Sequence, residues 1–482
     1  MTDSRRKEQK FASVPEGSSS LRHRDQAQTF FLEEQMDNIT LTPHQSESAK
    51  VILQYLTGQT DHKQTVLAGS AGSGKTLTVG HIVEALVSKG YSVHLCAHAH
   101  TAVAQIKKAL PEAVRGSVEA STIFSALGWR YSTKSQSSVA SGGHRLAGVD
   151  VVVIDEASMI DDVMYEAFAR LSDDTARPGV RLLWVGDPAQ LPPVNPDNQK
   201  DVSPVFSRVQ IQHRLNEVVR QAQDSPIIRA SIYVRECLEK DVKPCLRELQ
   251  ARAGDDDRVT ITSGGIAAVA EYTASAISAG LDARAVAYRN KTIDACIRII
   301  AKKTHPEGSE RLVVGDPVTF GTRYGENVST NTSAIVTSVS ECKDDHMECL
   351  KVTLKIDGVS DQGEIITPKS LDDLRRLNGA LKSTHSREKI KEQKAKDAGD
   401  TSAAMAARSA YYRAGEALQE VSDHYADLRL IYSMTAHKAQ GSTFDVAVID
   451  WQDMQSCSDL ATMCRLLYVA VTRPSRYLVL VE

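Results

Sequence analysis

Short apolar runs alternate with helical patterns along the chain from Leu41 onward. Val66–Ala68 is a compact apolar run that leads into a glycine-rich turn, and between Thr76 and Lys89 apolar residues recur on one helical face. Gly90 follows, at the position where helices commonly end on glycine. Further strands are predicted at residues 91–97, 151–154 and 181–185, with a helix at 103–110. Strands that alternate with helices favour a parallel sheet covered on both faces, so the pattern predicts an α/β fold.

The same alternation returns in a second stretch that is split along the sequence. Its first part spans residues 205–300, and its second part spans 430–482. In the second part, apolar strands at 446–449 and 477–481 flank a helix at 460–472. The two parts therefore predict a second α/β unit that is interrupted by an insertion.

The interrupting segment has two different patterns. Residues 312–367 alternate apolar and polar positions, which predicts a small antiparallel unit. Residues 369–429 contain no proline and are dense in Lys, Arg, Glu and Ala, as is typical of long solvated helices.

The composition is that of an ordinary globular protein. Of the 482 residues, 41% are hydrophobic and 24% charged, and no apolar run approaches the roughly 18 residues of a membrane span. The 57 Lys and Arg nearly balance the 61 Asp and Glu, so nucleic-acid binding requires a local basic surface. Residues 1–40 are polar and predict a disordered tail without the apolar core of a secretory signal. We expect a cytoplasmic protein.

The eight cysteines predict neither a disulfide framework nor a metal centre. No CxxC pair occurs, and the seven-residue spacings of Cys342 to Cys349 and of Cys457 to Cys464 fit no common zinc site. Scattered thiols of this kind are typical of a reducing compartment.

The clearest chemical motif lies between the first predicted strand and helix. Residues 69–76 read GSAGSGKT and match the phosphate-binding loop (P-loop) G-x-x-x-x-G-K-[ST]. Its backbone N–H groups and the following helix N-terminus suit phosphate oxygens, while Lys75 can reach the β- and γ-phosphates and Thr76 can ligate Mg²⁺. The expected nucleotide contacts are Gly69, Ser70, Ala71, Gly72, Ser73, Gly74, Lys75 and Thr76.

A second motif supplies the carboxylates that hydrolysis needs. The apolar strand at 151–154 ends in Asp155 and Glu156, as in a Walker B site. Asp155 is expected to hold Mg²⁺, and Glu156 to orient and deprotonate the attacking water. These two motifs predict NTP hydrolysis but do not identify the work that it drives.

Further segments resemble, in order, the motifs of superfamily 1 helicases. They are LTPHQ at 41–45 (the Q motif, which reads adenine), WVGDPAQLPP at 184–193 (motif III), LNEVVRQ at 215–221 (motif IV), TAHKAQGST at 435–443 (motif V) and LYVAVTR at 467–473 (motif VI). The HKAQGST segment, residues 203–206 and the insertion before motif V are similar to the 5′→3′ branch, superfamily 1B, with its RecD-like and Dda-type DNA helicases.

The resemblance implies an α/β protein with two tandem RecA-like P-loop parallel-sheet domains. It also implies a β-hairpin insertion in the first domain, and a β-barrel plus helical insertion in the second. The implied parts are residues 1–40 (polar tail), 41–204 (domain 1, with a pin-like insertion at 126–149), 205–311 with 430–482 (domain 2), and 312–429 (barrel and charged helices). The hairpin segment also fits a surface loop, and the barrel segment also fits an insertion without DNA contact.

Catalytic roles follow from the charge that develops on the transferred phosphoryl group, where cationic groups must converge. Lys75 supplies one cation, and Arg220 and Arg473 are candidate arginine fingers from domain 2. Gln190 is expected to link the nucleotide state to the domain boundary, and Gln45 to hydrogen-bond adenine through its amide. Motif V adds Gln440 and Gly441 to the expected ATP contacts.

Single-stranded DNA is expected to contact both domains through phosphate groups. The motif V donors are Thr435, His437, Lys438, Ser442 and Thr443, and Thr122 is a further candidate in domain 1. In the motif Ia region, AHAHTA at 97–102, His98 and Ala99 replace the family's proline and threonine, which leaves His100 and Thr101 as candidates. Phosphate contacts position DNA without reading its sequence, so low sequence preference is expected.

The sequence therefore predicts an ATP- and Mg²⁺-dependent DNA helicase that moves 5′→3′, a direction that rests on the resemblance alone. Expected partners are single-stranded DNA, ss/ds junctions and single-strand-binding, replication or repair proteins; we expect a monomer without membrane contact. Two alternatives stay open: an RNA-directed motor of the same superfamily, because phosphate contacts do not distinguish RNA, and an NTP-gated nucleic-acid-binding protein that does not unwind.

Overall fold

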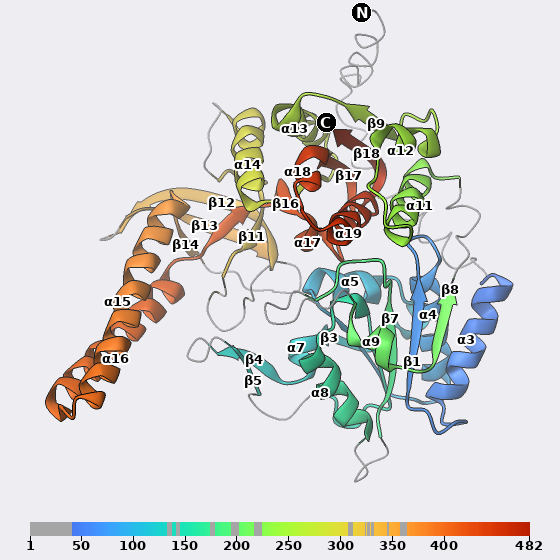
Figure 1. Ribbon diagram of the computed structural model, residues 1–482, viewed down its shortest axis with the longest axis horizontal. Helices are drawn as coiled ribbons and strands as arrows, with labels where there is room; N and C mark the ends of the chain where they lie inside the picture. The colour runs from blue at the N-terminus through green and yellow to red at the C-terminus, as the bar shows by residue number, and fades with distance from the viewer. Residues whose placement is uncertain are drawn as a thin grey trace, which may run out of the picture. The chain divides into compact units, whose positions relative to one another are not determined.

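The computed structural model describes residues 41–132, 137–140, 145–173, 179–193, 202–215, 224–306, 312–322, 324, 328, 332–344, 347–356 and 364–482. They form two compact units: the described residues of Met1–Cys296 with Met434–Glu482, and those of Ile297–Ser433 (Figure 1). The predicted tail at 1–40 and Arg220 lie outside the described residues.

The first unit begins with a six-stranded sheet in the order β3-β2-β6-β7-β1-β8, whose strand pairs are parallel. Its strands are β1 (Gln64–Gly69), β2 (Val93–Ala97), β3 (Glu119–Thr122), β6 (Val151–Ile154), β7 (Arg181–Gly186) and β8 (Gln212–Leu215). Its helices are α3 (Pro43–Leu56), α4 (Lys75–Ser88), α5 (His100–Lys108), α6 (Glu112–Arg115), α7 (Ile123–Ala126), η1 (Ala157–Met159), α8 (Asp162–Asp173) and α9 (Pro204–Arg208). We call these elements lobe 1.

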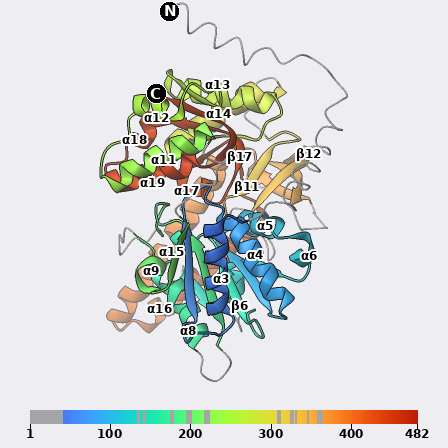
Figure 2. The ribbon, with the colours of Figure 1, turned by 90° about the vertical axis from the view of Figure 1, so that its right-hand side faces the viewer.

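Lobe 1 is α/β and parallel, as the sequence predicts, because both faces of its sheet are buried. On strand β6, Val151 and Val153 join the apolar cluster that includes residues of α3 and α4, whereas Val152 and Ile154 join the cluster that includes residues of α7 and α8. Figure 2 labels α3, α4, α8 and β6 in this lobe. Strand β8 pairs with β1, so the sheet extends beyond the boundary expected at residue 204.

A second sheet, in the order β16-β10-β17-β18-β9, forms lobe 2. Its strands are β9 (Val259–Thr262), β10 (Ala283–Ala287), β16 (Ser433–Thr435), β17 (Phe444–Asp450) and β18 (Pro474–Val481). Its helices are α11 (Pro226–Glu239), α12 (Leu246–Ala253), α13 (Gly265–Ser278), α14 (Asn290–Thr304), α17 (Ala436–Ala439), α18 (Trp451–Gln455) and α19 (Leu460–Val471). The β10–β17, β17–β18 and β18–β9 pairs are parallel, so the split α/β pattern folds into one sheet.

The segment expected as a pin contains an antiparallel hairpin, β4 (Trp129–Ser132) and β5 (Ser137–Ala140). At its base, the ring of Trp129 lies edge-on to Phe124, with centroids 6.2 Å apart. Residues 133–136 and 141–144 lie outside the described residues.

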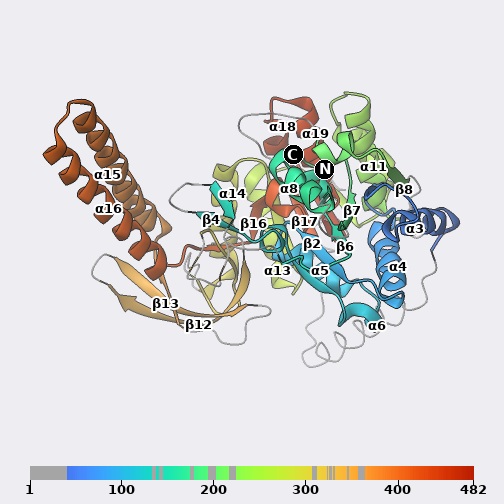
Figure 3. The ribbon, with the colours of Figure 1, turned by 90° about the horizontal axis from the view of Figure 1, so that it is seen from below.

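The second unit contains a five-stranded antiparallel sheet in the order β14-β13-β12-β11-β15. Its elements are β11 (Pro317–Phe320), β12 (Ser333–Lys343), β13 (Glu348–Ile356), β14 (Ile365–Pro368), β15 (Leu428–Leu430), α15 (Leu371–Asp397) and α16 (Thr401–His424). The Ala426 N–H donates to the Ile366 carbonyl (2.8 Å), which brings the two edges of the sheet together. The long charged helices form a hairpin (Figure 3).

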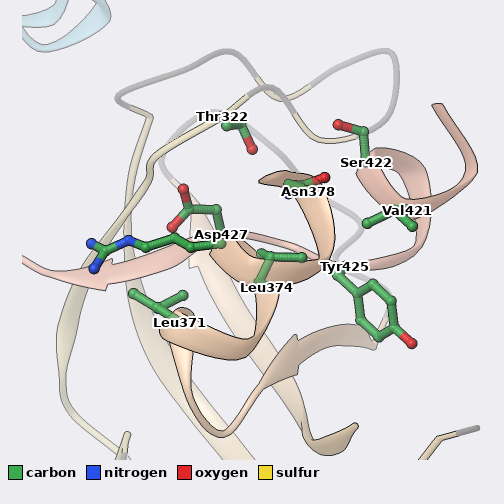
Figure 4. A pocket seen from close by; sticks show the side chains of 9 residues that line it. Thr322, Leu371, Leu374, Asn378, Val421, Ser422, Tyr425 and Asp427 are labelled. Atoms are coloured by element: carbon green, nitrogen blue, oxygen red, sulfur yellow. The ribbon is translucent and has the colours of Figure 1, made fainter. Parts of the chain in front are cut away.

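A small cavity of about 40 Å³ lies at the base of this helical hairpin (Figure 4). Leu374, Val421, Tyr425 and Asp427 are among its lining residues. Sites for drug-sized ligands occupy about 300–1,000 Å³, so this cavity is too small for a nucleotide.

Two further expectations concern cysteines and membranes. Cys342 and Cys349 face each other across β12 and β13 as free thiols. Among the described residues, no helix is long and apolar enough to cross a membrane.

Candidate nucleotide and nucleic-acid sites

The P-loop connects β1 to α4, and its glycines allow the turn. Gly72 (φ 76°) and Gly74 (φ 79°) adopt left-handed backbone conformations that favour glycine. A Cβ on Gly69 would lie 2.5 Å from the Ser73 hydroxyl oxygen, so the close packing of the loop requires glycine there too. The Ser73 hydroxyl donates to the Ser70 carbonyl (2.8 Å), which holds the loop curled.

Lys75 opens α4 and is folded back onto the loop. Its Nζ donates to the carbonyls of Gly69 (2.8 Å) and Ser70 (3.0 Å). Burial lowers the pKa of Lys75, while the nearby carboxylates of Asp187 and Asp155 oppose that change. Thr76, the next residue, is exposed and can offer its hydroxyl to a metal ion.

Asp155 and Glu156 stand at the carboxyl end of β6, as the sequence predicts. Burial raises the pKa of Asp155, against the effects of its hydrogen bond from the Glu156 N–H (2.8 Å) and of the Lys75 charge. Burial and then Asp155 raise the pKa of Glu156 to about 7, while the positive charge of Arg473 opposes the increase. A carboxyl with such a pKa is suited to accept a proton near neutral pH.

Motif V of lobe 2 lies directly against the Glu156 carboxylate. Gly441 has a φ of +75°, and a Cβ there would be 2.1 Å from Glu156 Oε1. Its neighbour Gln440 donates from Nε2 to the Ser158 hydroxyl (3.0 Å) and to Gln190 Oε1 (3.3 Å). The two motif V residues therefore reach the carboxylate end of the lobe 1 sheet.

Arg473 is 9% exposed and is held within lobe 2. Its guanidinium donates to the carbonyls of Val469 (2.9 Å) and Ser442 (3.2 Å) and to the Thr472 hydroxyl (2.8 Å). Burial lowers the pKa of Arg473, and the charge of Glu156 is the largest effect that opposes it. Arg473 also lowers the pKa of Lys75, so it lies within electrostatic reach of the P-loop.

Three lobe 2 residues contact motif III, and the sequence did not mark them as site residues. Arg465 donates to the carbonyls of Pro188 (2.5 Å) and Gln190 (2.8 Å). Tyr468 donates to Asp187 (2.6 Å), and Arg235 of α11 is 3.4 Å from the same carboxylate. Arg465 and Tyr468 interrupt an apolar helix with a spacing of three residues, which is the signal that could have identified them.

Gln45 supports the P-loop instead of offering a free amide. Its Nε2 donates to the Ser73 carbonyl (2.9 Å), and its Oε1 accepts from the Thr42 N–H (2.9 Å) in a capping box. The side chain is 3% exposed, and its amide nitrogen and oxygen each keep one further hydrogen-bonding position beyond these bonds.

The DNA candidates occupy two separate places in the first unit. Thr435 caps α17 by accepting from the Lys438 N–H (3.3 Å), while Lys438 and Thr443 are exposed. His437 and Ser442 are half-buried, and burial lowers the pKa of His437. In lobe 1, Thr122 caps α7; the backbones of His100 and Thr101 begin α5, but their side chains lie outside the described part.

A metal ion would have few protein ligands here. Among the described residues, no three His, Cys, Asp or Glu side chains gather into a metal site. Mg²⁺ needs no such cage, because it is commonly held by one or two carboxylates, water and substrate phosphates. The exposed Thr76 and the Asp155 carboxylate near Lys75 fit that donor set.

Comparison with known proteins identifies two families along the chain. Residues 40–252 match the AAA domain family, and residues 430–481 match the UvrD-like helicase C-terminal domain family. These regions contain the P-loop and motifs V and VI, respectively.

Two relatives and one solved structure are similar to the chain. The ATP-dependent RecD2 DNA helicase of Deinococcus radiodurans is 30% identical over 39% of this chain and 23% of its own length. The ATP-dependent DNA helicase dda of Enterobacteria phage T4 is 30% identical over 40% of this chain and 42% of its own length. The Pif1 helicase of Candida albicans has a TM-score of 0.41 and 16% identity, covering 92% of this chain and 95% of that one.

The matched regions span less than half the length of either curated relative. The first family match contains the P-loop and the Asp155–Glu156 pair, and the second contains Gly441 and Arg473. The chain therefore carries a region similar to the AAA domain family and a region similar to the UvrD-like helicase C-terminal domain family, and it is similar to the DNA helicases RecD2 and Dda.

Proposed function

We propose that this protein is an ATP-dependent DNA helicase that moves 5′→3′ on single-stranded DNA and unwinds duplex DNA. The observation that carries the proposal is the approach of Gly441 and Arg473 of lobe 2 to Glu156 of lobe 1. A hydrolytic carboxylate that is contacted by the opposite lobe allows the nucleotide state to change the contact between lobes.

Each catalytic side chain has a defined task in this proposal. Lys75 binds the phosphates, and Glu156 accepts the proton of the attacking water. Thr76 and Asp155 hold Mg²⁺, which would neutralise phosphate charge when bound. Arg473 stabilises the charge that develops on the γ-phosphoryl group, as an arginine finger does. Arg220, a second proposed finger, lies outside the described residues.

The choice of DNA rests on the names of the relatives, both of which are called DNA helicases. The exposed donors of Lys438 and Thr443 suit phosphate contacts that do not read sequence.

Partners in this proposal are single-stranded DNA, ss/ds junctions and single-strand-binding proteins, in replication, repair or recombination. The β4–β5 hairpin acts as a strand-separating pin. The protein acts in the cytoplasm as a monomer.

The test is a fluorescent unwinding assay on duplexes that carry a 5′ or a 3′ single-stranded tail. With Mg²⁺ and ATP, the wild type should unwind the 5′-tailed DNA, and Lys75→Ala should abolish both unwinding and ATP hydrolysis. Lys89→Ala is the control, because Lys89 is an exposed residue that follows the same helix and should leave both activities unchanged.

Unwinding by Lys75→Ala would refute the assignment of the ATP site. Preference for the 3′-tailed substrate would refute the direction, and stimulation of ATP hydrolysis only by RNA oligomers would refute the DNA substrate.

A further inference from the structure

One backbone amide of the P-loop is bound by a side chain from lobe 2. The Ala71 N–H donates to the hydroxyl oxygen of Tyr468, at 3.1 Å. Ala71 belongs to the loop whose backbone amides cradle phosphate oxygens in proteins with this motif. A phosphate that takes this amide must therefore displace Tyr468.

The Tyr468 hydroxyl is fixed on its other side by Asp187. Its O–H donates to Asp187 Oδ2 at 2.6 Å. The second oxygen of Asp187 accepts from the Ala189 N–H (3.0 Å) and lies 3.4 Å from Arg235 Nη1. The hydroxyl thus connects the P-loop to motif III and, through Asp187, to α11 of lobe 2.

The direction of these hydrogen bonds is determined by burial and charge. Tyr468 and Asp187 are each 1% exposed, and burial, followed by the charge of Asp187, raises the pKa of the phenol. Because the phenol stays protonated, its single proton goes to the carboxylate and its oxygen accepts from Ala71. Phosphate oxygens are also acceptors, so they compete with Tyr468 for the same N–H.

We propose that Tyr468 is a positioning residue that holds the Ala71 amide in the nucleotide-free protein and releases it when phosphate binds. This inference rests on the proposed nucleotide-hydrolysing function. Release removes the hydrogen bond between Ala71 and the hydroxyl, while the bond to Asp187 remains. The arrival of a nucleotide is thereby transmitted from the P-loop to α19 without a direct contact between Tyr468 and the nucleotide.

The test is Tyr468→Phe, which removes only the hydroxyl oxygen and keeps the buried ring. Fluorescently labelled ADP, titrated with Mg²⁺, should bind about 2- to 12-fold more tightly to the variant, because the competitor for the amide is gone. KM for ATP should fall as well, without an increase in kcat.

Tyr233→Phe is the matched control. Tyr233 is a buried lobe 2 tyrosine whose hydroxyl accepts a backbone N–H from Cys245 (2.9 Å) and does not bind the P-loop. The same chemical change there should leave ADP affinity unchanged. Unchanged or weaker ADP binding by Tyr468→Phe would overturn the proposal, because a merely structural tyrosine cannot improve affinity when its hydroxyl is lost.

Amide hydrogen exchange of the wild type and of Tyr468→Phe provides a second test. In the nucleotide-free protein the Ala71 amide should be protected, and in Tyr468→Phe it should exchange faster until ADP is added. Rapid exchange of Ala71 in the nucleotide-free wild type would overturn the inference. Failure of the wild type to bind labelled ADP at all would instead refute the proposed function, so the two failures are distinguishable.

Discussion

Glu156 has an unusual backbone conformation for a residue with a side chain. Its φ is 57°, and it is one of two non-glycine residues with positive φ in the described part of the chain. Such a conformation costs about 1–3 kcal/mol and persists where the surrounding structure enforces it. Here it places the carboxylate at the end of β6, against Gly441 of the opposite lobe.

Gly441→Ala tests this contact. The added methyl would lie 2.1 Å from Glu156 Oε1, so the carboxylate must move away from its position. General-base catalysis contributes about 10²–10⁴-fold, so displacement should lower kcat for ATP about tenfold to hundredfold. Steady-state ATP turnover measures the effect.

Gly280→Ala is the control for backbone strain. Gly280 has a similar φ of +78°, but a Cβ there would meet no atom within 4 Å. Both variants carry the cost of a side chain at positive φ, and only Gly441→Ala should lose turnover. Equal turnover in the two variants would show that Gly441 does not set the position of Glu156.

At the residue scale, the sequence identifies functional side chains when the residues that act with them are close by in the chain. The P-loop and the Asp155–Glu156 pair are local motifs, and the structure places Lys75 and Asp155 close enough for their charges to interact. Arg235 and Arg465 contact motif III only through tertiary folding, which a spacing pattern does not encode. Gln45 forms hydrogen bonds within the protein, because its amide oxygen closes the capping box of α3 and its amide nitrogen donates to the Ser73 carbonyl of the P-loop.

At the scale of elements, α19 presents one polar edge on an otherwise buried helix. Arg465 is 8% exposed and donates to the Pro188 and Gln190 carbonyls of motif III. Hydrogen bonds from a charged donor contribute about 1.5–3 kcal/mol. This edge therefore provides a directional attachment between helix and loop in addition to apolar packing.

Arg465→Ala should weaken that attachment while leaving the phosphate site intact. We expect DNA-stimulated ATP turnover to fall about tenfold to hundredfold, with labelled-ADP affinity within about twofold of wild type. Measuring both turnover and ADP affinity distinguishes a loss of the attachment between α19 and motif III from damage to the phosphate site. Normal stimulation by single-stranded DNA would mean that the contact between α19 and motif III does not couple the lobes.

A second element-scale prediction concerns Asp453 in α18. Its buried carboxylate accepts from the N–H groups of Tyr288 (2.7 Å) and Arg289 (2.9 Å) and from the Thr292 hydroxyl (2.6 Å). Asp453→Ala leaves these donors unpaired and should cost about 3 kcal/mol of unfolding free energy. Asp459→Ala removes an exposed cap of α19 and should cost about 1 kcal/mol.

Urea denaturation of both variants provides the measurement. A loss for Asp453→Ala no larger than that for Asp459→Ala would contradict the assigned role of the buried carboxylate.

Strands and helices were predictable from the sequence where nearly all of their residues are buried and apolar. Strand β6 reads VVVI with every residue buried, and α19 begins at Leu460 as the helical pattern predicts. Strand β8 reads QHRL and has one buried residue, because it is an edge strand. A polar edge strand has no apolar signature, which is why the sequence pattern does not predict the pairing of β8 with β1.

At the scale of the whole molecule, the two lobes share buried apolar contacts as well as polar ones. Ala189 and Leu191 of motif III belong to the same apolar cluster as Leu467 and Val471 of α19. Motif III therefore packs into lobe 2 while its strand, β7, stays in the lobe 1 sheet. A change at the phosphate site can reach lobe 2 through this continuous packing.

The most direct test of the central claim, that both lobes complete one hydrolytic site, is ATP turnover by Arg473→Ala in the presence of single-stranded DNA. We expect labelled-ATP binding to remain near wild type and turnover to fall about 10³-fold or more, as for an arginine finger. The control Arg476→Ala alters an exposed arginine three residues along the chain and should turn over ATP normally. Turnover by Arg473→Ala equal to that of the control would contradict a site shared between the lobes.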